Sequence, residues 1–132
     1  MKQLLLEKAL EARENAYAPY SHFLVGAAVL AEDGRIFTGC NVENASYGAT
    51  ICAERNAAAR AVAEGARTFT AIAIAGGTES EGITDECFPC GICRQVLSEF
   101  ASEDGMQVIL WDGKGEPGVY SLSHLLPSSF RL

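Results

Sequence analysis

The sequence has little positive charge, only two histidines and no apolar stretch long enough to cross a bilayer. Glu7, Lys8 and Glu11 interrupt its leucine-rich start before the core of a signal peptide could form, which predicts a cytoplasmic protein. Ten Lys and Arg residues against 17 Asp and Glu residues give a net charge of −7, and the basic residues are scattered. No basic stripe is present to neutralise a phosphate backbone, so we expect neither nucleic acid nor a membrane as partner, but a small molecule of little or no negative charge.

The sequence also lacks internal repeats, linkers and low-complexity tracts, so we expect residues 1–132 to form a single domain. Five cysteines are present. Because this number is odd and no secretory signal is expected, free thiols or metal ligands are a better interpretation than a disulfide framework.

The residues that are present alternate between helical and extended patterns. Apolar positions at helical spacing predict helices over residues 2–17, 51–64 and 90–103, and a last helical turn over 123–126. Short apolar runs predict strands over 24–30, 35–40, 69–75, 107–111 and 119–120, with irregular loops over 41–50 and 78–88.

Turn residues and element order indicate how these strands are arranged. Asp33-Gly34 joins the first two strands as a hairpin, and Gly76-Gly77 is expected to end the third. Strands that alternate with helices in the second half favour a parallel component. The sequence therefore predicts an α/β protein with a three-layer α/β/α fold, in which helices cover both faces of a mixed five-stranded sheet.

The candidate metal-binding and catalytic residues are concentrated in two cysteine-bearing segments, Cys52-Ala53-Glu54 and Pro89-Cys90-Gly91-Ile92-Cys93. Cys90 and Cys93 are three residues apart, so at a helix start both sulfurs lie on one face. Cys52 also opens a helix, and helix N-termini favour thiolates. Three thiolates leave the fourth position of a tetrahedral zinc open for water, as in catalytic sites. Glu54 can serve this water only if Cys52 caps its helix and Glu54 lies in the first turn.

Other interpretations of these residues stay open. Cys90 and Cys93 could be a thioredoxin-like redox pair, or Cys87 could close the site as a fourth ligand of a structural zinc. Glu54 could simply stabilise the helix dipole. We expect Cys40 to be a small buried apolar residue, and His22 and His124 to be surface or structural residues rather than ligands.

The motifs together resemble the small zinc-dependent cytidine deaminases of the homotetrameric type. The resemblance extends over nearly the whole chain: Tyr17-Ala18-Pro19-Tyr20-Ser21-His22-Phe23, Val25-Gly26-Ala27-Ala28, Gly39-Cys40-Asn41-Val42-Glu43-Asn44-Ala45-Ser46-Tyr47, Cys52-Ala53-Glu54-Arg55, Pro89-Cys90-Gly91-Ile92-Cys93-Arg94-Gln95-Val96 and Leu125-Leu126-Pro127. The combination is highly specific, and it contains the Cys-Ala-Glu and Pro-Cys-x-x-Cys elements of zinc deaminases. The chain departs from the family in its longer acidic loop, which contains Cys87, and in its short tail after Phe130.

The resemblance implies hydrolytic deamination of cytidine, and of 2′-deoxycytidine, to the uridine nucleoside and ammonia, a reaction of pyrimidine salvage. A zinc-activated hydroxide would attack the base while Glu54 shuttles protons. One Zn²⁺ per chain would be held by Cys52, Cys90 and Cys93. Arg55 would hydrogen-bond the sulfurs and offset the negative charge of three thiolates.

The resemblance also implies a nucleoside pocket, shared between subunits of a homotetramer. Its substrate-binding residues would be Phe23, Asn41, Glu43, Ala53, Tyr47 and Phe130, of which Tyr47 and Phe130 could come from a neighbouring subunit. From the residues alone, Asn41 would be a turn residue, Glu43 a solvated charge and Phe23 part of the core. Two other functions remain open: deamination of a modified cytosine nucleoside of the blasticidin S type, and a zinc protein without catalysis.

Overall fold

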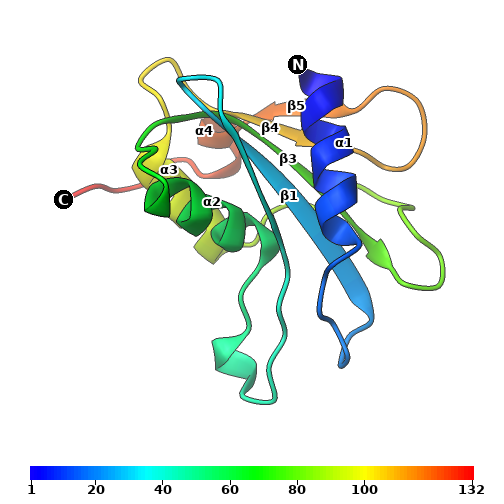
Figure 1. The fold of residues 1–132 in the computed structure, drawn as a ribbon. Coiled ribbons are helices and arrows are strands. Elements are labelled where there is room, and N and C mark those ends of the chain that lie inside the picture. The colour runs from blue at the N-terminus through cyan, green and yellow to red at the C-terminus, as the bar shows by residue number, and fades with distance from the viewer.

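The computed structural model describes residues 1–132 as one mixed sheet between helices (Figure 1). The strands are β1 (Phe23–Ala31), β2 (Ile36–Cys40), β3 (Phe69–Thr78), β4 (Gln107–Leu110) and β5 (Gly118–Ser121). The helices are α1 (Lys2–Arg13), α2 (Ala53–Ala63), α3 (Gly91–Phe100) and α4 (Leu122–Leu125), with a 3-10 turn η1 (Tyr47–Ala49). The strand order is β2-β1-β3-β4-β5, and only β3 and β4 pair in parallel. This confirms the predicted mixed five-stranded sheet and its parallel component.

The sheet is covered on both faces, which confirms the three-layer prediction. Figure 1 shows α1 on one face of the sheet and α2 with α3 on the other. Along β3, the side chains facing α1 are Ala71, Ala73 and Ala75, whereas Ile72 and Ile74 belong to the core beneath α2 and α3. Successive residues of a strand point to opposite faces, so this alternation of Ala and Ile gives each face its own core. Small side chains on the first face allow α1 to lie close to the strands.

The first helix is shorter than its apolar pattern predicted, because the residues after it pair elsewhere. It ends at Arg13 rather than at residue 17. The Tyr17 N–H donates to the Asn41 carbonyl at 3.0 Å, and the Glu43 N–H donates to the Tyr17 carbonyl at 2.8 Å. The start of the loop 41–50 is therefore held beside the segment that leads into β1.

The third strand is longer than predicted. It continues through Gly76 and Gly77 to Thr78 and pairs with β1 over this length. A Cβ atom on Gly77 would lie closer than 3.0 Å to the backbone of Gly82, and one on Gly76 would lie 2.7 Å from the Cys87 sulfur. The two glycines thus allow the following loop to fold back against the strand, and they do not end it.

The remaining boundaries differ by a few residues. The helix predicted over 90–103 ends at Phe100, because the Ser102 N–H donates to the Phe69 carbonyl at 3.0 Å. Residues 41–52, which include η1, extend beyond the body of the sheet (Figure 1). None of the helices is both long and apolar enough to span a membrane.

Candidate metal centre

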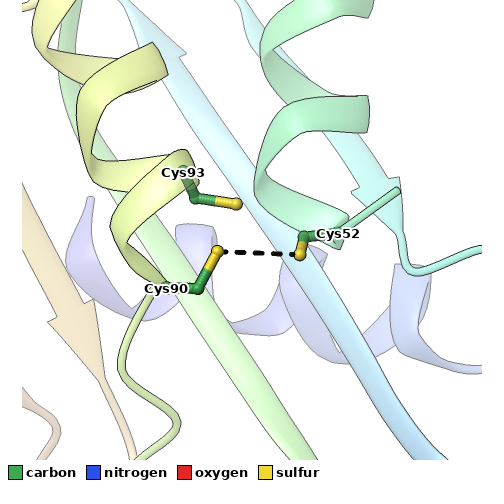
Figure 2. Close-up of side chains that lie close together, drawn as sticks. All are labelled: Cys52, Cys90 and Cys93. Carbon is green, nitrogen blue, oxygen red and sulfur yellow. Dashed lines mark hydrogen bonds between the residues drawn. The ribbon is translucent and has the colours of Figure 1, made fainter. Parts of the chain in front are cut away.

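Three cysteine sulfurs meet where two helices begin. Cys52 is the N-cap of α2, Cys90 is the N-cap of α3, and Cys93 lies in the first turn of α3. Figure 2 shows the three side chains pointing toward one another from the two helix starts. Their sulfur atoms all lie within 4.8 Å of one another, as the spacing of the motif predicted.

The spacing of the sulfurs fits one zinc ion. Zn–S bonds of about 2.3 Å in a tetrahedron place two sulfurs about 3.8 Å apart. The Sγ atoms of Cys52 and Cys90 are 3.9 Å apart. The group contains three ligands, all of them sulfur. Cys52, Cys90 and Cys93 are therefore suited to holding one zinc ion, and they would leave one tetrahedral position free of protein ligands.

The electrostatics of the site favour a thiolate at Cys52. Hydrogen bonds from Cys93 and Arg55 lower the pKa of the Cys52 thiol to about 5. The same hydrogen bond, together with burial, raises the pKa of the Cys93 thiol, which therefore keeps its proton more firmly. A divalent cation can replace that proton, because zinc binding deprotonates its thiol ligands.

Arg55 lies against the sulfur ligands. Its Nη2 atom donates to the Cys52 sulfur at 3.6 Å and to the Thr50 carbonyl at 3.4 Å, and its Nε atom is buried without a hydrogen-bond partner. Hydrogen bonding to Cys52 raises the pKa of the guanidinium further. A permanent positive charge at this place reduces the negative charge that three thiolates present to the metal.

Glu54 occupies the place that the catalytic interpretation requires. It lies in the first turn of α2, two residues after the cap, and only 4% of it is exposed. Burial, with a smaller contribution from Cys52, raises the pKa of the Glu54 carboxyl to about 7. A carboxyl group with such a pKa can both accept and release a proton near neutral pH.

Cys87 lies outside the metal cluster. The only cluster of potential ligands that the chain forms contains Cys52, Cys90 and Cys93. The Cys87 side chain lies instead against Gly76 of β3, and burial raises the pKa of its thiol to about 12. The geometry therefore disfavours a closed four-cysteine site.

Asn41 directly follows β2, and its side chain forms hydrogen bonds with the backbone at the start of β1. Its Oδ1 accepts from the Val25 N–H at 2.9 Å, and its Nδ2 donates to the Phe23 carbonyl at 2.8 Å. The residue is 9% exposed. An amide group has two N–H donors and two acceptor lone pairs, so one of each remains for a ligand.

Glu43 holds the turn before β1. Its Oε1 accepts from the backbone N–H groups of Tyr20 and Ser21, at 3.0 and 3.1 Å, and its Oε2 accepts from the Ser21 hydroxyl. These hydrogen bonds, first that of the Ser21 hydroxyl, lower the pKa of the Glu43 carboxyl. The residue is therefore more than a solvated charge, since it fixes the backbone just before Phe23.

The other predicted binding residues lie in different surroundings. Ala53 is fully buried at the start of α2, and Phe23 begins β1 with 38% of its surface exposed. Tyr47 and Phe130 are 76% and 65% exposed. Within one chain, neither of these last two lies in an enclosed pocket.

Sequence reasoning missed a second arginine at the site, Arg94. Its Nε donates to the Pro89 carbonyl at 2.6 Å and its Nη1 to the Leu125 carbonyl at 2.7 Å. It thereby ties the residue before Cys90 to the end of α4. Its position directly after Cys93 was the available signal, although its two acceptors could not be identified from the sequence.

Comparison with known proteins leads to the same class of site. The family model of the cytidine and deoxycytidylate deaminase zinc-binding region matches residues 1–108. A cytidine deaminase of Sporosarcina psychrophila is 47% identical over 96% of this chain and 88% of its own length. One from Halalkalibacterium halodurans is 45% identical over 98% and 93%.

Solved structures agree in fold. A crystal structure of cytidine deaminase from Burkholderia pseudomallei has a TM-score of 0.86 and 47% identity, with 98% of this chain and 99% of that chain covered. One from Mycobacterium tuberculosis has a TM-score of 0.79 and 40% identity, over 98% and 97%. The fold and the three-cysteine centre are thus those of a zinc-dependent deaminase. The chain belongs to the cytidine and deoxycytidylate deaminase family.

Proposed function

We propose that the chain catalyses the hydrolytic deamination of cytidine, and of 2′-deoxycytidine, to the corresponding uridine nucleoside and ammonia. The observation that carries the proposal is the buried Glu54 carboxyl group beside a zinc centre with three protein ligands. A structural zinc site is closed by four protein ligands, whereas a catalytic one keeps a position for water.

A zinc ion held by Cys52, Cys90 and Cys93 would supply the acidity of the attacking water, because a catalytic zinc lowers the pKa of its bound water far below that of free water, to about 7. Glu54 then moves the protons. Its carboxylate takes a proton from the water that attacks C4 of the base and delivers it to N3. A second proton passes through the same carboxyl group to the amino group, which leaves as ammonia. Water and nucleoside are thereby converted into ammonia and the uracil nucleoside, with Glu54 regenerated.

Asn41 and Glu43 are the proposed ribose contacts. Asn41 retains one N–H and one lone pair beyond its contacts with β1, and these suit a hydroxyl group. Glu43 lies two residues further along, and its carboxylate can accept from a second hydroxyl. The Phe23 ring, partly exposed at the start of β1, is the proposed stacking surface for the base. The backbone of Ala53 is the proposed polar contact of the base.

The charge of this region favours a nucleoside over a nucleotide. Hydrogen bonding keeps the pKa of the Glu43 carboxyl below its usual range, so Glu43 is anionic at neutral pH. An anion beside the ribose repels a 5′-phosphate, and the chain as a whole carries a net charge of −7. We therefore expect cytidine to react faster than its monophosphate.

We further propose a homotetramer in which neighbouring chains complete each pocket. An apolar groove of about 480 Å³ lies along α2 and α3, and its lining residues are Arg55, Ala58, Ala59, Val62, Ala63, Val96 and Phe100. A second copy of the chain is the proposed occupant, since exposed apolar surface of this kind favours association. Tyr47 on the projecting loop and Phe130 near the end of the chain are both exposed, so they can reach the pocket of a neighbour. The cytoplasm and pyrimidine salvage are the proposed setting.

The direct test mixes the purified chain with cytidine and follows uridine and ammonia. We expect equal amounts of both products, loss of activity with a zinc chelator, and recovery when zinc is restored. Parallel reactions with 2′-deoxycytidine, cytidine monophosphate and blasticidin S define the substrate class. No ammonia from any nucleoside, with zinc fully bound, would refute the proposal, and preference for blasticidin S would move the function to modified cytosine nucleosides.

A further inference from the structure

The loop that leads to Cys90 has almost no backbone support. Residues 83–89 make no backbone–backbone hydrogen bond, either as donors or as acceptors. The segment is nevertheless directly connected to Cys90, which caps α3 and supplies one of the three sulfurs. A loop without backbone hydrogen bonds opens at a low free-energy cost unless side chains restrain it. The position of Cys90 therefore depends on the side-chain contacts of this segment.

Two hydrogen bonds connect the segment to the rest of the chain. One is the contact of Arg94 with the Pro89 carbonyl, described above. The other joins more distant elements: the Tyr120 hydroxyl of β5 donates to Glu86 Oε1 at 2.6 Å. The remaining side-chain hydrogen bond of the segment is internal, between Thr84 and Asp85.

The surroundings of Glu86 and Tyr120 strengthen their contact. The Phe88 ring lies edge-on to the Tyr120 ring, with centroids 5.2 Å apart. A Cβ atom on Gly118 would lie 2.5 Å from Glu86 Oε2. Because glycine has no side chain, the Glu86 carboxylate can lie directly against the start of β5. Tyr120 thus holds the segment at two places, through its hydroxyl at Glu86 and through its ring at Phe88.

We propose that Glu86 and Tyr120 form a positioning pair, which holds the segment 83–89 so that the Cys90 sulfur stays in place for zinc. The pair touches neither the metal nor the substrate and acts through the backbone between Glu86 and Cys90. Loss of the pair lets the segment open, and Cys90 then leaves the metal more often. The inference rests on zinc binding by the three cysteines and is independent of the proposed reaction.

Zinc release from the zinc-loaded chain tests the pair without any substrate. The rate is measured at 25 °C by transfer of zinc to a chromogenic chelator. Tyr120→Phe removes the hydroxyl and keeps the ring against Phe88, and we expect release roughly three- to tenfold faster. Glu86→Gln keeps an acceptor without charge and should have a smaller effect in the same direction. Combining both changes should exceed Tyr120→Phe alone by less than about twofold, because both remove one interaction.

Asp85→Asn is the matched control. It removes the same charge from the neighbouring residue, whose only side-chain hydrogen bond is to Thr84, and it should leave the release rate unchanged. Parental release rates in both Tyr120→Phe and Glu86→Gln would overturn the inference. So would equal acceleration by Asp85→Asn, or a lower unfolding temperature with an unchanged release rate, which would make the pair merely structural. If Tyr120→Phe does not fold, Glu86→Gln against Asp85→Asn decides the question.

Discussion

Single side chains around Cys52 determine what this centre can do, and they differ in how far the sequence reveals them. The three-cysteine cluster could be predicted because its members were expected at two helix starts, and Cys52 and Cys90 are indeed the caps of α2 and α3. The contacts of Asn41 and Glu43 with the β1 backbone and the preceding turn could not. They join residues many positions apart, and no local pattern specifies such pairs.

Glu54→Gln tests the proton carrier. The amide has nearly the size of the carboxyl group but cannot accept a proton at neutral pH, so we expect zinc content to stay the same. Turnover of cytidine should fall at least about 10²-fold, the low end for a general acid–base. Metal analysis and steady-state kinetics on the same sample check both parts. Full activity would contradict the role of Glu54, whereas loss of zinc would show that the residue supports the metal site itself.

Cys87→Ala tests the number of sulfur ligands. Because the Cys87 thiol lies against Gly76 and outside the cluster, the zinc content of the purified chain should not change. Cys90→Ala is the matched control and should lower it, since the same atom is removed from a ligand. A clear drop in zinc with Cys87→Ala would favour the closed four-cysteine site.

Helices and strands were predicted in the right order and of the right kind, but most of their ends were displaced by one or more residues. Periodicity identifies the middle of an element, whereas its end depends on what the next residues contact. Gly76 and Gly77 illustrate this: they resemble a strand terminus, yet they remain in β3 because Cys87 and Gly82 lie directly against them. The helix after Met1 ends early for a related reason, the pairing of Tyr17 with residues 41 and 43.

The contact between β2 and α2 sets the place of the Cys52-bearing helix, and Gly39→Ala tests it. A Cβ atom on Gly39 would lie closer than 3.0 Å to the backbone of Ala53 and Ala57. Backbone atoms cannot yield as a flexible side chain can, so we expect unfolding in urea to require about 1–3 kcal/mol less free energy. Gly48→Ala, with nothing within 4 Å, is the control and should change stability by less than about 0.5 kcal/mol. Equal stability of the two variants would show that α2 can move away from β2.

The chain as a whole exposes apolar surface on the side of α2 and α3, and the proposed tetramer accounts for it. Ala59 and Ala63 lie one helical turn apart in the groove along these helices, and both are exposed. Assembly is the part of the prediction that rests most on family resemblance, because neither periodicity nor motif spacing specifies how subunits meet.

Ala59→Glu tests this surface. A charge in the groove must be desolvated when a second chain covers it, so we expect the parent to have the mass of four chains and the variant a smaller mass. Light scattering after gel filtration measures both. Gln3→Glu introduces the same charge on α1, across the sheet, and should leave the mass unchanged. A parent with the mass of one chain and full activity would contradict the tetramer with shared pockets.

A ligand set made only of sulfur has a consequence for metal identity. Soft donors bind copper(I) as well as zinc, and proteins achieve selectivity between such ions partly through what the cell supplies. Cys90, the exposed member of the trio, is the natural first point of contact for an incoming thiophilic ion. We therefore expect excess copper(I) to replace zinc at the centre and to inactivate the chain without unfolding it. Which metal occupies the centre would then depend on the metals that the cell supplies.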